Sequence, residues 1–236
     1  MAGRTLGKDS MFPGDVTEIV AIDGPAGAGK STVARNVARQ LGFAYLDTGA
    51  MYRAATWNAM NKGVDADDPL ALAASTREMR LDLRDENGTL HIFIDGQEVT
   101  DAIRTPEVTR RIAKLDRNAG VRAHLAELQR EIGARAPTVA EGRDMGTVVF
   151  PRAKCKVYLD ANLDERARRR ARDFDAKGIA YDAASLKEEI RARDENDRSR
   201  DIAPLRRAED AVLVDTSSMS ADDVVNTIVE FARTRW

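Results

Sequence analysis

The stretch EIVAIDGPAGAGKSTVARNVARQLG, residues 18–42, decides the fold of this chain. It opens with the apolar run 19–22, passes through a glycine-rich loop, and continues with Val33, Val37 and Leu41 at the spacing of a helix face. An apolar run followed by a turn and a helical period predicts a strand, a loop and a helix in direct succession.

The loop of this unit carries the pattern G-x-x-x-x-G-K-[ST] over residues 24–31, between strand and helix, where that pattern binds phosphates. Glycines let the backbone approach a phosphate, and the N–H groups at a helix N-terminus point toward it. We expect Lys30 to lie exposed in the loop and to reach the β- and γ-phosphates of ATP, and Ser31 to offer its hydroxyl to Mg²⁺. The expected ATP site comprises Gly24, Pro25, Ala26, Gly27, Ala28, Gly29, Lys30, Ser31 and Thr32.

Further apolar runs predict that this unit belongs to a larger sheet. They lie at 43–47 and near Val139, Val157 and Leu213, and helical sequence follows each one directly or after a short loop. About five strands that alternate with helices imply an α/β fold whose parallel sheet is covered on both faces.

Residues 68–135 interrupt this alternation and predict an insert. Apolar and polar residues alternate through its first half, and Asn87-Gly88 and Asp95-Gly96 stand where hairpins would turn. We expect a small antiparallel sheet followed by helices, inserted into a core formed by residues 18–67 and 136–236.

Composition excludes several classes of protein. The 236 residues include 37 basic and 39 acidic side chains, so no overall field draws the chain to nucleic acid or to an anionic membrane. The single cysteine, Cys155, cannot form an internal disulfide and is expected to be an inert buried thiol, and no apolar run approaches the ~20 residues of a membrane span. We expect a monomer in the cytoplasm, with residues 1–17 as a flexible leader because they lack the apolar core of a signal peptide.

A phosphate loop alone leaves kinases, GTPases and ATPases open. A GTPase needs N-K-x-D to recognise guanine, but Asn61-Lys62-Gly63 is followed by Val64. Many ATPases have an apolar strand that ends in acidic residues. The strand KVYLD ends at Asp160 and could match this pattern, so an ATPase stays open at this point.

The arginines favour a kinase. Arg53 and Arg143 follow predicted strands, and transfer of a phosphoryl group needs cations around both donor and acceptor. A basic run can equally form a solvated helix face with ion pairs such as Arg193 with Asp197, and we prefer that interpretation for Arg168.

Several motifs together resemble the bacterial-type cytidylate kinase family. They are GPAGAGKS, LDTGAMYR (46–53), EGRDMGTVVFP (141–151), DERARRR (164–170) and the stretch from Arg193 to Ser217, and the resemblance covers residues 18–233. It implies a nucleoside-monophosphate-kinase fold with an insert that closes over the monophosphate and a helical lid near 163–182. It also implies phosphorylation of CMP and dCMP by ATP, with a broader UMP/CMP kinase, another small P-loop kinase or a nucleotide-dependent switch as alternatives.

The resemblance also implies the roles of individual residues. Those around the CMP phosphate are Thr48, Arg53, Arg143 and Arg200, of which Arg143 and Arg200 act catalytically with Lys30. The ribose contacts are Arg193 and Asp197, the base-reading pair is Arg122 and Asp144, and the lid arginines over ATP are Arg166, Arg169 and Arg170. Where the family usually has a serine near the cytosine, this chain has Ala113.

Overall fold

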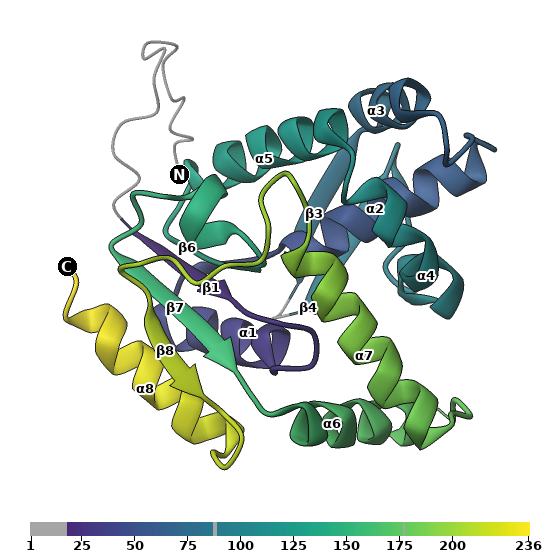
Figure 1. The fold of residues 1–236 in the computed structure, drawn as a ribbon. Helices are drawn as coiled ribbons and strands as arrows, with labels where there is room; N and C mark the ends of the chain where they lie inside the picture. The colour runs from purple at the N-terminus through teal and green to yellow at the C-terminus, as the bar shows by residue number, and fades with distance from the viewer. Residues whose placement is uncertain (1–17, 87–88, 177) are drawn as a thin grey trace, which may run out of the picture.

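The computed structural model describes residues 18–86, 89–176 and 178–236, and Figure 1 shows its two sheets. The large sheet has the strand order β2-β6-β1-β7-β8, and every neighbouring pair is parallel. Its strands are β1 (Ile19–Asp23), β2 (Ala44–Asp47), β6 (Thr138–Gly142), β7 (Cys155–Asp160) and β8 (Val212–Asp215). The predicted five-stranded parallel sheet is therefore confirmed, and the loop after its central strand β1 opens at the carboxyl edge between β6 and β7.

Helices cover both faces of this sheet. The core helices are α1 (Lys30–Leu41), α2 (Thr48–Asn61), α6 (Leu163–Ala176), α7 (Ala183–Arg198) and α8 (Ala221–Arg233). In Figure 1, α1 and α8 pack side by side on one face, and α2 lies on the other. Helix α1 ends at Gly42, whose φ of 72° allows its N–H to bond to the carbonyl of Ala38.

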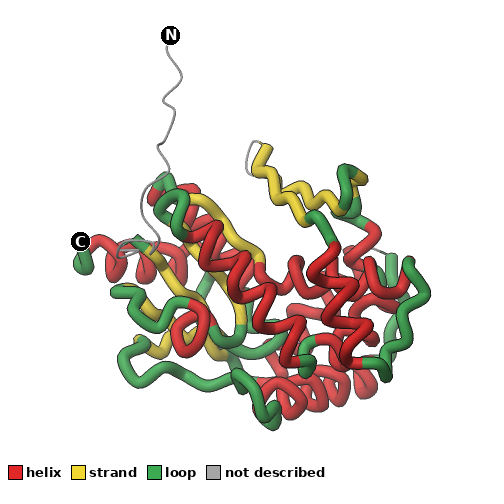
Figure 2. Tube along the Cα trace, turned by 90° about the horizontal axis from the view of Figure 1, so that it is seen from above, coloured by secondary structure: helices red, strands yellow, loops and turns green. Residues whose placement is uncertain are grey.

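The predicted insert contains the second sheet and three further helices. Its elements are α3 (Pro69–Glu78), β3 (Leu81–Glu86), β4 (Thr89–Ile94), β5 (Gln97–Glu98), the short 3₁₀ turn η1 (Ala102–Arg104), α4 (Pro106–Leu115) and α5 (Ala119–Gly133). Strands β3, β4 and β5 form the expected antiparallel meander, which stands apart from the large sheet in Figure 2. Asp95 and Gly96 both have positive φ, as an Asp-Gly hairpin turn requires, whereas Asn87-Gly88 lies outside the described residues.

The insert and the core share one hydrophobic cluster. Ile92 of β4 and Leu125 of α5 belong to the same buried cluster as Ile19 of β1. A Cβ placed on Gly133, at the end of α5, would lie 2.8 Å from the ring of Phe150 and 3.2 Å from Ile19, so α5 packs directly against the core. No helix in the described ranges is both long and apolar enough to cross a bilayer.

Candidate active site

The phosphate loop is held by close backbone contacts. Gly24 has φ of 151°, and a Cβ there would lie only 2.0 Å from the carbonyl oxygen of Leu159 in β7. Gly27 and Gly29 also have positive φ, and Gly29 caps the start of α1. Only glycine permits this path, so the spacing of the motif follows from the backbone geometry.

Lys30 is buried, and the expectation of an exposed side chain is wrong. Its Nζ donates to the carbonyl of Pro25 at 2.8 Å, because the loop curls around its own lysine. Burial, with Arg143 acting in the same direction, lowers the pKa of Lys30 to about 7. The amino group of Lys30 therefore sits at the centre of the loop.

Ser31 is exposed beside the loop, and its side chain lies near Glu141, the buried carboxylate near the end of β6. Tyr45 donates to the same carboxylate at 2.9 Å, and burial raises the pKa of Glu141. Glu141 was not identified as a site residue from the sequence. Its position near the end of a predicted apolar strand was the signal that could have identified it. Asp160 ends the strand on the other side of β1 and accepts from the N–H of Ala161.

Five cations from different elements meet beside this loop: Lys30, Arg53, Arg143, Arg193 and Arg200. Burial, followed by Arg143 and Arg53, lowers the pKa of Arg193 to about 10. Burial also lowers the pKa of Arg53. Like charges gathered at a poorly solvated place destabilise one another. Asp47, Asp116, Glu141 and Asp197 lie among these cations and offset part of the repulsion, and an anionic ligand bound between them would offset more of it.

Asp197 organises this cluster. It accepts from Nε of Arg143 at 2.6 Å, and its other oxygen lies 3.7 Å from Nη2 of Arg200. Although burial acts in the opposite direction, Arg143 holds the pKa of Asp197 below its ordinary value. Asp197 is buried and bonds to Arg143, so this part of α7 is not a solvated face, although the charges of Arg193 and Asp197 do act on each other.

Thr48 connects the start of α2 to the sheet. Its hydroxyl donates to the carbonyl of Glu141 at 2.6 Å, and the preceding Asp47 caps α2 by accepting from the N–H of Ala50 at 2.8 Å. The start of α2, which carries Arg53 in its second turn, is therefore fixed against β6.

The predicted base-reading pair is already assembled. Arg122 donates through Nη2 to Asp144 at 2.6 Å, both side chains are buried, and the guanidinium lies 5.3 Å from the ring centroid of Tyr52. Asp23, at the end of β1, accepts from the N–H groups of Met145 and Gly146 at 2.8 Å each. Asp23 thereby fixes the turn that begins at Asp144, a role that sequence reasoning missed.

Two of the three predicted lid arginines contact the phosphate loop. Arg166 donates to the carbonyl of Ala26 at 3.0 Å, and Arg169 to that of Ala28 at 3.2 Å. Arg170 instead lies over the ring of Phe174, at 4.5 Å from its centroid. Arg168 is exposed and pairs with Glu165 on its own helix, as expected for a solvated face.

Asp194 is a further residue that the sequence did not reveal. This buried carboxylate on α7 pairs with Arg166 and also accepts from the N–H of Ala26 at 3.2 Å. Ala26 is therefore held through its carbonyl by α6 and through its N–H by α7.

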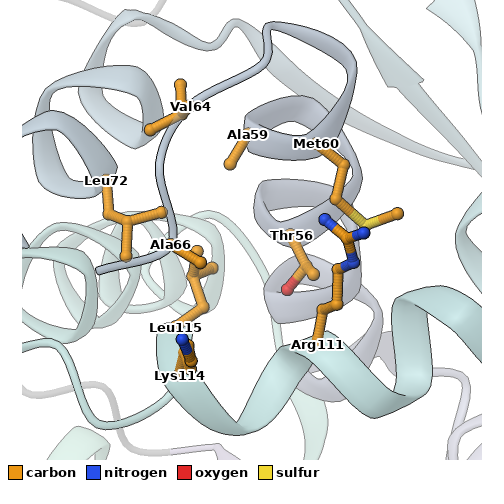
Figure 3. Close-up of a pocket in the computed structure, with 9 residues that line it drawn as sticks. All are labelled: Thr56, Ala59, Met60, Val64, Ala66, Leu72, Arg111, Lys114 and Leu115. Atoms are coloured by element: carbon orange, nitrogen blue, oxygen red, sulfur yellow. The ribbon is translucent and has the colours of Figure 1, made fainter. Parts of the chain in front are cut away.

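The pocket in Figure 3 lies elsewhere, between α2, α3 and α4. Its walls are mostly apolar, and its two basic side chains, Arg111 and Lys114, pair with Glu107 and Asp67. It contains none of the predicted site residues and lies where the core segment 56–66 meets the insert helices α3 and α4, so it is not the candidate site.

Residues 20–234 match the family model described as cytidylate kinase. This chain belongs to the cytidylate kinase family. The bifunctional pantoate ligase/cytidylate kinase of Synechococcus elongatus is 50% identical over 222 residues, which cover 92% of this chain and 42% of that protein. The cytidylate kinase of Bacillus licheniformis is 43% identical over 212 residues, which cover 89% of this chain and 94% of that protein.

This cytidylate kinase family member spans less than half of the length of its bifunctional relatives but nearly the whole of the shorter ones. Among solved structures, TT1252 from Thermus thermophilus is 19% identical with a TM-score of 0.46, and the match covers 92% of this chain and 97% of that one. The fold assignment for this member of the cytidylate kinase family rests on its strand order and its phosphate loop.

Proposed function

We propose that this chain transfers the γ-phosphoryl group of ATP to the phosphate of CMP or dCMP. The observation that carries the proposal is the meeting of five cations from separate elements beside the phosphate loop. A protein that only binds ATP does not need a second anion site. A kinase that transfers a phosphoryl group from ATP to a nucleoside monophosphate does need one, because it must bind two phosphorylated nucleotides. The match to the cytidylate kinase family supports cytosine as the base.

ATP lies with its phosphates on residues 24–32. Lys30 exchanges the Pro25 carbonyl for the β- and γ-phosphates, and the N–H groups at the start of α1 face the same oxygens. Ser31 is the residue that would hold Mg²⁺, and the nearby Glu141 places a carboxylate close to its hydroxyl, which suits a cation that prefers oxygen ligands. When bound, Mg²⁺ neutralises charge on the transferring phosphoryl group.

The acceptor nucleotide lies across the cation cluster. Its phosphate contacts Arg53, Arg143 and Arg200, with Thr48 at the edge of that site. Arg193 and Asp197 bind the ribose. The phosphate oxygen is already a nucleophile at neutral pH, so these side chains need only align it, neutralise charge and exclude water.

Arg122 and Asp144 bind the base. A carboxylate accepts from the 4-amino group of cytosine, and a guanidinium donates to its O2 and N3. Their buried 2.6 Å ion pair supports this assignment, because the two groups are oriented before a ligand arrives.

We further propose that residues 68–135 act as a lobe that closes over the monophosphate, and that residues 163–182 act as the lid over ATP. Arg166 and Arg169 would move from the loop carbonyls toward the phosphates as the lid closes, with Arg170 leaving Phe174. The same proposal places a monomer in the cytoplasm, a compartment that suits the free buried thiol of Cys155, whose pKa burial raises to about 12.

The test is an ADP-release assay with Mg·ATP and each nucleoside monophosphate in turn. We expect rapid release with CMP and dCMP, weak release with UMP, and little with purine acceptors. Equal rates with CMP and UMP would indicate the broader kinase, and preference for another acceptor would indicate a different small kinase. Slow hydrolysis that is indifferent to the acceptor would indicate a nucleotide-dependent switch and contradict the proposal.

A further inference from the structure

Asp116 ends helix α4 inside the acceptor site. Its N–H donates to the carbonyl of Ile112 at 2.9 Å, its φ and ψ of −72° and −11° continue the helix, and the residue is only 8% exposed. At 100° per residue, Asp116 and Ala113 share one side of α4, whereas Arg111 and Lys114, at the pocket of Figure 3, occupy the other. Asp116 therefore faces the same side as the position where the family usually has a serine.

The groups that face Asp116 come from three helices and the segment after α7. Arg200 approaches Oδ2 to 3.6 Å, and Nη1 of Arg122 donates to the backbone carbonyl of Asp116 at 3.0 Å. The neighbouring nitrogen of the same guanidinium binds Asp144, so Asp116 stands next to the base-reading pair. The charged or titratable groups that surround it are Tyr52, Arg122, Arg193, Asp197 and Arg200.

One oxygen of this carboxylate lacks a partner. Within the described residues, Oδ1 of Asp116 is buried and makes no hydrogen bond, and the same holds for Nε of Arg122 and Nη2 of Arg200 beside it. Burial raises the pKa of Asp116 to about 6. A buried polar atom without a partner is costly and rare in a folded protein, so three of them in one site indicate a ligand that completes them.

The chemistry of the carboxylate limits what it can bind. An ionised carboxylate only accepts hydrogen bonds, and the oxygens of an ionised phosphate also only accept, so Asp116 cannot serve the phosphate. The donors on CMP are the sugar hydroxyls and the 4-amino group. Asp197 is the nearby candidate to accept from the sugar hydroxyls. The 4-amino group has two hydrogens and Asp144 can accept only one of them, so one hydrogen still needs an acceptor.

We propose that Asp116 is a specificity-determining residue that accepts the second hydrogen of the cytosine 4-amino group. This inference rests on the proposed function. With UMP, the oxygen at the same place would face two carboxylates and be repelled. Ala113 has no hydroxyl and cannot accept a hydrogen bond from the base. Asp116 supplies that acceptor.

The test compares kcat/KM for CMP, dCMP and UMP in Asp116→Asn, in wild type and in a control, Asp222→Asn, which changes an exposed aspartate on α8. The amide of Asp116→Asn can donate to O4, so we expect the CMP-to-UMP ratio to fall about 10- to 100-fold, the discrimination of one good base-edge contact. The CMP-to-dCMP ratio should stay constant, and the control should match wild type. Equal losses for CMP and UMP, or a change confined to the CMP-to-dCMP ratio, would overturn the proposal.

A second measurement keeps the proposal testable if the Asp116 variant does not fold. Asp144→Ala removes the other carboxylate, and it should still prefer CMP over an analogue that carries hydrogen in place of the 4-amino group. Loss of that preference would show that Asp144 alone contacts the amino group. If no nucleoside monophosphate stimulated ADP release by the wild type, the proposed function and this inference would both be overturned. If the wild type selected CMP but the CMP-to-UMP ratio of kcat/KM were unchanged in Asp116→Asn, this inference alone would be overturned.

Discussion

Gly24→Ala tests whether the close approach of β1 to β7 fixes the phosphate loop. A Cβ at this position would lie 2.0 Å from the carbonyl oxygen of Leu159, more than 1 Å inside the carbon–oxygen contact distance of about 3.3 Å. Strand β1 is bonded to β6 on its other side, and β7 is bonded to β8, so neither strand can move away without losing ladder hydrogen bonds. The clash must therefore be absorbed by the backbone of the loop.

The expected cost has two parts. Overpacking in a rigid place costs about 1–3 kcal/mol, and a side chain at φ of 151° adds strain of about 1–3 kcal/mol. The free energy of unfolding should fall by about 2–6 kcal/mol, which lowers Tm by about 4–24 °C for a chain of this size. Turnover should fall as well, because the loop would no longer present its N–H groups to the phosphates.

Gly42→Ala is the matched control. Gly42 also has positive φ, 72°, but in the part of the chain that the structure describes no atom beyond its chain neighbours lies within 4 Å of an added Cβ. Its cost should be the left-handed backbone alone, about 1–2 kcal/mol. Urea unfolding of both variants, with thermal melts as a second measure, gives the comparison. Equal losses of stability in the two variants would refute the argument that β7 excludes a side chain at Gly24.

Three further predictions concern catalysis and the base. Lys30→Met should keep the fold but reduce kcat by roughly 100-fold or more, since one charged donor to the transferring group is lost; near-normal turnover in single-turnover kinetics would refute the role of the lysine. Arg53→Ala should raise KM for CMP and lower kcat without changing the ATP affinity of the binary complex, with Arg168→Ala as the exposed control; a collapse of ATP binding in calorimetry would assign Arg53 to the other nucleotide. Asp144→Ala should reduce the CMP-to-UMP ratio of kcat/KM by about 5- to 150-fold, a contribution of about 1–3 kcal/mol; an unchanged ratio in this variant would refute the role of the carboxylate at the base.

Local patterns predicted most of the fold. The apolar runs that start near residues 19, 44, 138, 155 and 212 became the five parallel strands, and the period-two segment became the meander. Each of these signals lies within a few residues of chain, where the side-chain period directly reflects the backbone. Cys155 is buried in β7, as its position at the start of an apolar strand predicted.

Contacts between distant segments could not be predicted in the same way. The hydrogen bonds of Asp23 reach Met145, 122 residues later, and that of Arg166 reaches Ala26, 140 residues earlier. Nothing in the local period of either segment marks these partners. For the same reason the sequence motif placed Lys30 in the loop but did not show that the lysine is buried and bonded to the Pro25 carbonyl.

Helix α7 touches both halves of the proposed active site through two carboxylates three residues apart. Asp194 accepts from the N–H of Ala26 in the phosphate loop, and Asp197 pairs with Arg143 at the proposed acceptor phosphate site. We therefore expect the binding of the two nucleotides to be energetically coupled, because whichever binds first positions the helix that serves the other. Thermodynamic linkage then requires reciprocity: the factor by which ATP changes the affinity for CMP equals the factor by which CMP changes the affinity for ATP.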